Sequence, residues 1–230
     1  MVRSTPPINM PTYLRLRDQI CADIEDGCWR LGQHLTLHEL SAHYRVSNVP
    51  VREALLQLQG DGMVDMRMNK GAVVRVVDAR FIDEYFDVRE VLQSLQLARA
   101  CRSGQARTPQ MRAGVSALLE SLEEATRHGR VRELLAADDA LQDHLARLAG
   151  HDQALGMQAS RGRLLEAFRR ARMPLWAPEL EVLAAQGRAM LQALDHAEPA
   201  IAVEAVRRHV AASRAYMARL LKLPELPPPR

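Results

Sequence analysis

The sequence predicts a mainly α-helical protein in two parts, a winged helix-turn-helix followed by an all-α helical bundle. Three observations in the 230-residue chain support this fold class. Two short amphipathic segments flank a tight turn before residue 60, and one β-hairpin pattern follows them. From residue 79 onward, Leu, Ala and Val recur every three or four residues. The expected domains are residues 1–77 for the winged helix-turn-helix, 78–223 for the helical bundle, and 224–230 as a Pro-rich tail.

The composition is typical of a globular protein, with 47% hydrophobic and 26% charged residues. No apolar run approaches the ~18 residues that a membrane span needs, and no secretory pattern opens the chain. We therefore expect a cytoplasmic location and no membrane partner. Three cysteines without a CxxC pair exclude a disulfide framework and a Cys-rich zinc site.

Bulk charge does not mark the first part as a nucleic-acid binder. Residues 1–77 carry nine cationic and eight anionic side chains, a net charge of +1. Of the 31 cationic residues in the chain, only Lys70 and Lys222 are lysines. Arginine suits bidentate contacts to bases and phosphates, although a high Arg content also follows from genome composition. DNA binding must therefore be argued from local geometry.

Three helices are expected before the hairpin. Residues 11–27 place Tyr13, Leu16, Ile20 and Ile24 on one face, and Gly27 ends this helix. Thr36 and Glu39 form a capping box for a two-turn helix. After a short turn, Ser47 caps a third helix, which tolerates Pro50 in its first turn and stops at Gly60.

The hairpin pattern completes a winged helix-turn-helix. Residues 63–68 and 72–77 are rich in Val and Met, and they flank the turn Asn69-Lys70-Gly71. Helix, helix, tight turn, helix and hairpin is the order that this DNA-binding fold requires. Each piece alone occurs in many folds, so the order carries the prediction.

The motifs of residues 27–74 resemble those of the GntR family of bacterial transcription regulators. The similarity lies in Val46-Ser47-Asn48-Val49-Pro50-Val51-Arg52-Glu53-Ala54-Leu55, and in the wing Asn69-Lys70-Gly71-Ala72. The helical second part resembles the ligand-sensing FCD domain of the FadR-type branch, which implies that residues 78–223 bind an effector and form the dimer. The resemblance implies a ligand-responsive homodimeric regulator, a repressor in the commoner mode, and no enzyme.

The resemblance also implies which residues bind double-stranded operator DNA. Arg52 stands where the family has a DNA-contacting Arg, which suits a bidentate contact to guanine. Asn48 stands where Arg is usual, which favours adenine or a phosphate, and Val49 suits a thymine methyl group. Arg67 is equally well read as part of a solvated strand face. The expected DNA-binding residues are Arg45, Ser47, Asn48, Val49, Pro50, Arg52, Arg67, Asn69, Lys70 and Gly71.

Six helices are expected in the second part, at about 80–102, 109–128, 131–149, 152–172, 178–196 and 198–222. Leucines supply the expected core of the bundle. On the first of these helices the expected core residues are Leu92, Leu95 and Leu97.

Many members of the FCD branch bind a divalent metal through one Asp and three His, and this chain lacks two of these imidazoles. Asp138 and His209 match the family's ligands, whereas Gln142 and Gly187 replace two histidines. Two strong ligands hold Zn²⁺ poorly. We therefore expect no metal and no other cofactor.

The same positions suggest a metal-free effector pocket. Arg89 resembles an Arg that faces the ligand in this family, and the small Gly187 would leave room beside it. The expected effector is a small organic acid or acyl compound, bound by Arg89, Asp138, Gln142, Gly187 and His209. Three alternatives stay open: a structural Arg89–Asp138 ion pair, a constitutive regulator that senses nothing, and a helical-bundle enzyme without a visible nucleophile–base pair.

Overall fold

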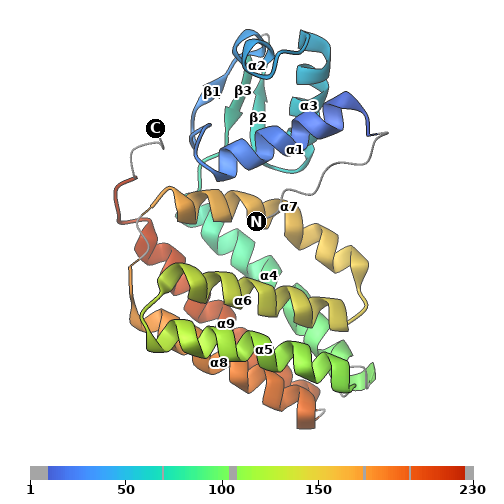
Figure 1. Cartoon of the computed structure of the whole chain (residues 1–230), viewed down its shortest axis with the longest axis vertical. Coiled ribbons are helices and arrows are strands. Elements are labelled where there is room, and N and C mark those ends of the chain that lie inside the picture. The colour runs from blue at the N-terminus through green and yellow to red at the C-terminus, as the bar shows by residue number, and fades with distance from the viewer. Residues whose placement is uncertain (1–9, 69, 104–107, 173–174, 197, 226–230) are drawn as a thin grey trace. The chain divides into compact units, whose positions relative to one another are not determined.

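The structure is a computed structural model that describes residues 10–68, 70–103, 108–172, 175–196 and 198–225. Asn69 and most of the expected Pro-rich tail lie outside these residues. Within them the chain is mainly helical with one small sheet, as the sequence predicted (Figure 1). The chain divides into two compact units. Unit 1 is residues 1–77, 159–172 and 225–230, and unit 2 is residues 78–158 and 173–224.

Unit 1 contains the helix-turn-helix and its wing. Helices α1 (Thr12–Glu25), α2 (Leu37–Tyr44) and α3 (Asn48–Gly60) precede an antiparallel sheet in the order β1-β3-β2. Strands β2 (Val64–Arg67) and β3 (Gly71–Val74) form the expected hairpin, with Arg67 opposite Gly71. The two-residue strand β1 (His34–Leu35), which pairs with β3, was not expected from the sequence.

The turn between α2 and α3 depends on one residue with left-handed backbone geometry. The capping box at the start of α2 is present: the Glu39 amide donates to the Thr36 hydroxyl at 3.1 Å, and the Glu39 side chain accepts from the Thr36 amide. Arg45 ends α2 with φ 54° and ψ 45°. Ser47 is the N-cap residue of α3, but its side chain makes no capping hydrogen bond, contrary to the sequence expectation.

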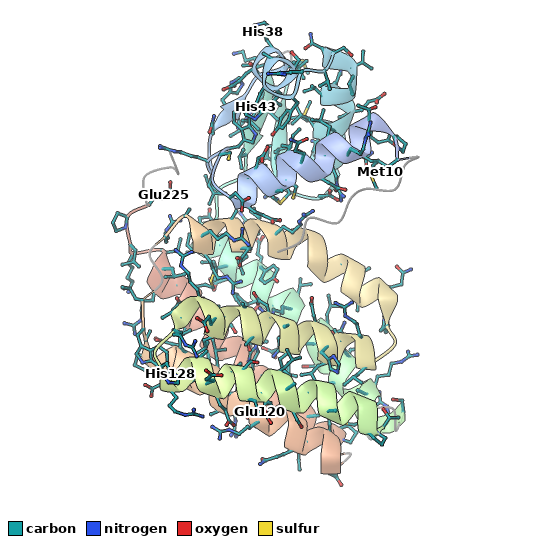
Figure 2. All side chains as sticks on the ribbon, in the orientation of Figure 1. Met10, His38, His43, Glu120, His128 and Glu225 are labelled. Carbon is teal, nitrogen blue, oxygen red and sulfur yellow. The ribbon has the colours of Figure 1, made fainter. Side chains whose placement is uncertain are left out.

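A polar chain anchors α2 to α1. The Trp29 indole donates to the Tyr44 hydroxyl at 2.7 Å, and that hydroxyl donates to Asp23 on α1 at 2.6 Å. The ring of His43, labelled in Figure 2, packs edge-on against Trp29 and Tyr44. Buried side chains of α1 and α3 form the core beneath them: Leu16, Ile20, Ile24, Val51, Leu55 and Leu58.

Unit 1 also includes the second half of helix α7 (Asp152–Arg170). Arg163 pairs with Glu25 at 2.6 Å, and Arg170 pairs with Asp26 at 2.6 Å. These two ion pairs join this half-helix to the end of α1. The sequence predicts residues 159–172 as part of the bundle, because their helical spacing does not differ from that of the neighbouring helices.

Unit 2 is a helical bundle. Besides the first half of α7 it contains α4 (Ala79–Ser103), α5 (Pro109–Arg127), α6 (Val131–Leu148), α8 (Pro178–His196) and α9 (Pro199–Leu220). These bounds differ from the sequence prediction by two residues at most. One expected core residue is wrong: Leu97 is buried, but Leu95 is 45% exposed. No helix in the described ranges is long and apolar enough to span a membrane.

Candidate DNA-binding face and effector pocket

Helix α3 presents one face to solvent and buries the other. Val51, Ala54, Leu55 and Leu58 are buried in unit 1. Asn48, Val49 and Arg52 are exposed, and Val49 retains 66% of its surface. The first turn of the helix therefore offers an amide, an aliphatic side chain and a guanidinium to an incoming ligand.

The remaining expected DNA-binding residues surround this helix and the wing. Arg45 and Ser47 in the turn are exposed, as are Arg67 and Lys70 on the hairpin, whereas Pro50 is half-buried in the first turn of α3. Asn69, at the wing turn, lies outside the described residues.

Close packing of the sheet backbone requires a glycine at position 71. It is buried with φ +86°, and a Cβ atom there would lie 2.0 Å from the Leu35 carbonyl oxygen. Only glycine allows the backbone of β3 to approach β1 so closely. A side chain at this position would therefore face the backbone of the sheet.

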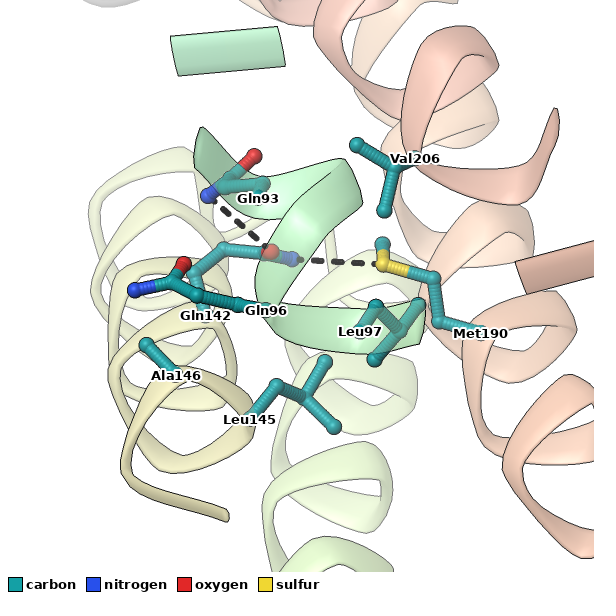
Figure 3. Close-up of a pocket in the computed structure, with 8 residues that line it drawn as sticks. All are labelled: Gln93, Gln96, Leu97, Gln142, Leu145, Ala146, Met190 and Val206. Carbon is teal, nitrogen blue, oxygen red and sulfur yellow. Dashed lines mark hydrogen bonds between the residues drawn. The ribbon is translucent and has the colours of Figure 1, made fainter. Parts of the chain in front are cut away.

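A small cavity lined by three glutamines and five apolar side chains lies in the bundle between α4, α6, α8 and α9 (Figure 3). Gln93 and Gln96 of α4 meet Gln142 of α6 there, and the Gln93 amide donates to the Gln142 Oε1 atom at 3.3 Å. Both amide atoms of Gln96, and Gln93 Oε1, are buried without a hydrogen-bond partner in the described part of the chain. The cavity measures about 10 Å³, which is the room that one water molecule needs.

Asp138 and His209 lie close to this cavity. Asp138 is one helical turn before Gln142 on α6, and His209 is three residues after the cavity-lining Val206 on α9. His209 Nε2 is 3.6 Å from Asp138 Oδ2, too far for a hydrogen bond. Complete burial, and secondly the charge of Arg89, lower the pKa of His209 well below its usual value. The imidazole is therefore neutral at physiological pH.

The residues at the family's metal positions do not form a metal site. Only Asp138 and His209 carry side chains that bind metals well, and Gln142 is engaged with Gln93. Among the described residues, no group of three or more His, Cys, Asp or Glu side chains is arranged to hold a metal ion. The side chains of Asp138, Gln142 and His209 therefore do not fit the divalent metal that many members of the FCD branch bind.

Arg89 and Gly187 do not line the cavity. The half-buried Arg89 lies 5.6 Å from the centre of the Phe86 ring, close enough to His209 to act on its pKa. A Cβ atom on Gly187 would meet Leu141, Leu119 and Leu122 at 3.1–3.9 Å. Leucine side chains therefore fill the space that the missing side chain was expected to leave for a ligand.

Sequence reasoning missed Gln93 and Gln96. Both stand among leucines on a long helix and read as solvated positions. A signal was present: Gln93 lies seven residues after the buried Phe86 and four before the buried Leu97, which is the spacing of one helix face. A polar residue in register with buried neighbours marks an internal polar site.

Two comparisons with protein families decide what the chain is. The profile of the gntR family of bacterial regulatory proteins matches residues 12–74, and that of the FCD domain matches residues 84–212, more than half of the chain. The chain belongs to the GntR family, in its FCD-domain branch. This regulator carries a DNA-binding helix-turn-helix and is not an enzyme.

Individual relatives agree with this assignment. An uncharacterised HTH-type transcriptional regulator of Mycobacterium tuberculosis is 32% identical over 110 residues, which cover 46% of this chain and 44% of that protein. The match thus spans less than half of this relative's length. A probable D-xylose utilization operon repressor of Paenarthrobacter nicotinovorans is 25% identical over 86% of this chain and 85% of its own.

Solved structures agree in fold. Escherichia coli McbR/YncC has a TM-score of 0.71 at 19% identity, and the match covers 93% of this chain and all of that one.

Proposed function

We propose that this regulator is a homodimeric repressor that binds operator DNA through α3 and the wing, and that a small molecule bound in the bundle relieves repression. The observation that carries the proposal is the exposed first turn of α3 on a helix whose opposite face is buried. A recognition helix needs this division, because one face must hold the domain while the other enters the major groove.

The chemistry of the exposed turn suits base recognition. Arg52 has the paired donors that match guanine O6 and N7, and the Asn48 amide matches adenine N6 and N7. Val49 offers a methyl surface suited to thymine. Around this turn, Arg45, Ser47, Arg67 and Lys70 supply donors for phosphates, and the Ser47 hydroxyl is not used for capping. A twofold dimer would present two such turns to a palindromic site.

Selection of bound DNA from a random pool, followed by affinity measurements, tests the DNA proposal. Arg52→Ala should weaken the selected site by about 1–3 kcal/mol and relax the preference at one base pair. Lys70→Ala should weaken all DNA sequences about equally and flatten the salt slope by about one. Gln59→Ala is the matched control, because Gln59 lies on the same side of α3 two turns further along and is exposed. Equal losses of Arg52→Ala on cognate and random DNA would contradict base reading.

The glutamine-lined cavity supports the effector proposal. Gln93 Oε1 and both amide atoms of Gln96 are buried without a partner among the described residues, and a carboxylate or acyl carbonyl would accept hydrogen bonds from Gln96 Nε2. Such a compound exceeds 10 Å³, so binding requires that the helices around the cavity move apart. This displacement is the change that DNA binding would sense.

The small size of the cavity also favours a second candidate, a constitutive repressor that senses no ligand. A panel of carboxylates and acyl thioesters in thermal shift assays separates the two candidates, since a ligand that binds only the folded state raises its stability. Gln96→Leu sharpens the test. It removes two unpaired buried amide atoms, so it should retain or raise the unfolding free energy while losing the ligand response. Absence of any stabilisation across the panel favours the constitutive repressor.

A further inference from the structure

Helix α4 carries an apolar stripe on its outer face. Val88, Val91 and Leu95 are 59%, 67% and 45% exposed. Their spacing of three and four residues places them on one side of the helix, one turn after another. Single exposed apolar residues are ordinary on protein surfaces, whereas these three lie next to one another and form a contiguous apolar patch.

Opposite charges border the two ends of this stripe. Glu84 lies one turn before Val88, and Arg99 lies one turn after Leu95, both exposed on the same face. Glu84 pairs with Arg80 at 2.7 Å, but both side chains are well exposed and such a pair is weak. Arg99 makes no ion pair with any of the described residues. Acidic side chains on other faces of α4 are engaged elsewhere, as Asp87 is with Arg214.

We propose that the stripe binds the same stripe of a second copy of this chain, with the two α4 helices antiparallel. The inference rests on the homodimer proposed above and names its surface. A twofold axis between Val91 and Leu92 sets Val88 of one copy against Leu95 of the other. The same register sets Glu84 against Arg99, twice by symmetry. A parallel pair would instead place like charges together, which disfavours it.

The stripe on α4 accounts for only part of the area that a dimer interface needs. Fifteen helical steps separate Glu84 from Arg99, so the surface between them is about 22 Å long. With a width of one helix diameter, about 10 Å, it covers on the order of 220 Å². A stable interface buries about 800 Å² on each partner. The stripe thus supplies the apolar centre of the interface, and elements beside α4 must supply the remaining area.

Engineered cysteines test the position of the axis in the full-length protein. Cys28→Ser first removes the exposed native thiol, since Cys21 and Cys101 are buried. In that background, Val91→Cys should form a disulfide-linked dimer under mild oxidation, because positions next to a twofold axis approach within disulfide range. Val182→Cys is the matched control, because Val182 is 42% exposed but lies on α8.

A mixing experiment tests the direction of the helices. Protein with Val88→Cys and protein with Leu95→Cys, each in the Cys28→Ser background, should cross-link to each other in preference to themselves. Self-cross-linking of each single variant in preference to the mixed pair would indicate a parallel arrangement and overturn the proposal.

Charge exchange tests the ion pairs. Glu84→Arg and Arg99→Glu should each weaken the dimer about tenfold or more, since two symmetric pairs turn repulsive. The double variant should restore the dimer. Light scattering reports the oligomeric state throughout. A monomeric wild type would refute the homodimer itself, whereas a dimer that resists both the Val91→Cys cross-link and charge reversal would refute only this surface.

Discussion

Substitution of Gly71 by alanine should unfold the wing. The new Cβ atom would lie 2.0 Å from the Leu35 carbonyl oxygen, so β3 and β1 must separate by about 1 Å to reach the shortest contact that Cβ atoms show. That movement breaks the pair of hydrogen bonds that Val74 makes with Gly32 and Gln33, both 2.9 Å long. Two such bonds contribute about 2 kcal/mol, and alanine at φ +86° costs about 1–2 kcal/mol more.

The expected loss of unfolding free energy is therefore about 3–4 kcal/mol, a large share of the stability of a small domain. Calorimetry should show the transition of the DNA-binding unit at least about 10 °C lower. Hydrogen exchange should show lost protection at the amides of Gly32 and Val74. Gly60→Ala is the control: no atom lies within 4 Å of its Cβ position, so it should be neutral or slightly stabilising. Unchanged stability of Gly71→Ala would refute the reasoning.

Three further predictions follow from single residues. Arg45→Gly relieves a left-handed backbone and should raise the melting temperature by a few degrees while weakening DNA binding; a lower melting temperature would contradict the strain argument. Burial raises the pKa of the Cys21 thiol to about 12, so Ellman's reagent at pH 8 should modify exposed Cys28 rapidly and Cys21 only after unfolding. Burial lowers the pKa of His209, so the unfolded state binds a proton that the folded state does not. The unfolding free energy should therefore fall by up to about 1.4 kcal/mol per pH unit below about pH 6.5, and His209→Gln should lose this slope.

Local signals made the helix-turn-helix predictable. The capping box of Thr36 and Glu39, and the glycines at 27 and 60, act within a few residues of their own position, so one sequence suffices to read them. Strand β1 was missed because two residues are too short to show alternation, and its existence depends on β3 nearly forty residues later. Ser47 stands at the N-cap position that the sequence predicts, but its side chain makes no capping hydrogen bond, because residue type sets a preference for the position and does not fix the side-chain rotamer.

The interior of the bundle was less predictable, for a different reason. Helix α4 carries apolar residues on more than one face, so spacing alone does not separate buried Leu97 from exposed Leu95. The surroundings of Gly187 also depend on three-dimensional packing. Leucines from α5 and α6 fill the space beside this glycine, and the sequence does not show that they meet there. The match to the family's metal ligands correctly predicted that Asp138 and His209 lie close together. It did not predict Gln93 and Gln96, because they line the cavity from α4, a helix that carries none of the family's metal ligands.

The two tryptophans give each unit its own optical reporter. Trp29, held by Tyr44, is buried in unit 1, whereas Trp176 is 39% exposed in unit 2. Replacing either one by phenylalanine leaves a single fluorophore, blue-shifted for Trp29 and red-shifted for Trp176. Emission from the two single-tryptophan proteins would then show, during urea titration, whether the halves of this regulator melt together or one after the other.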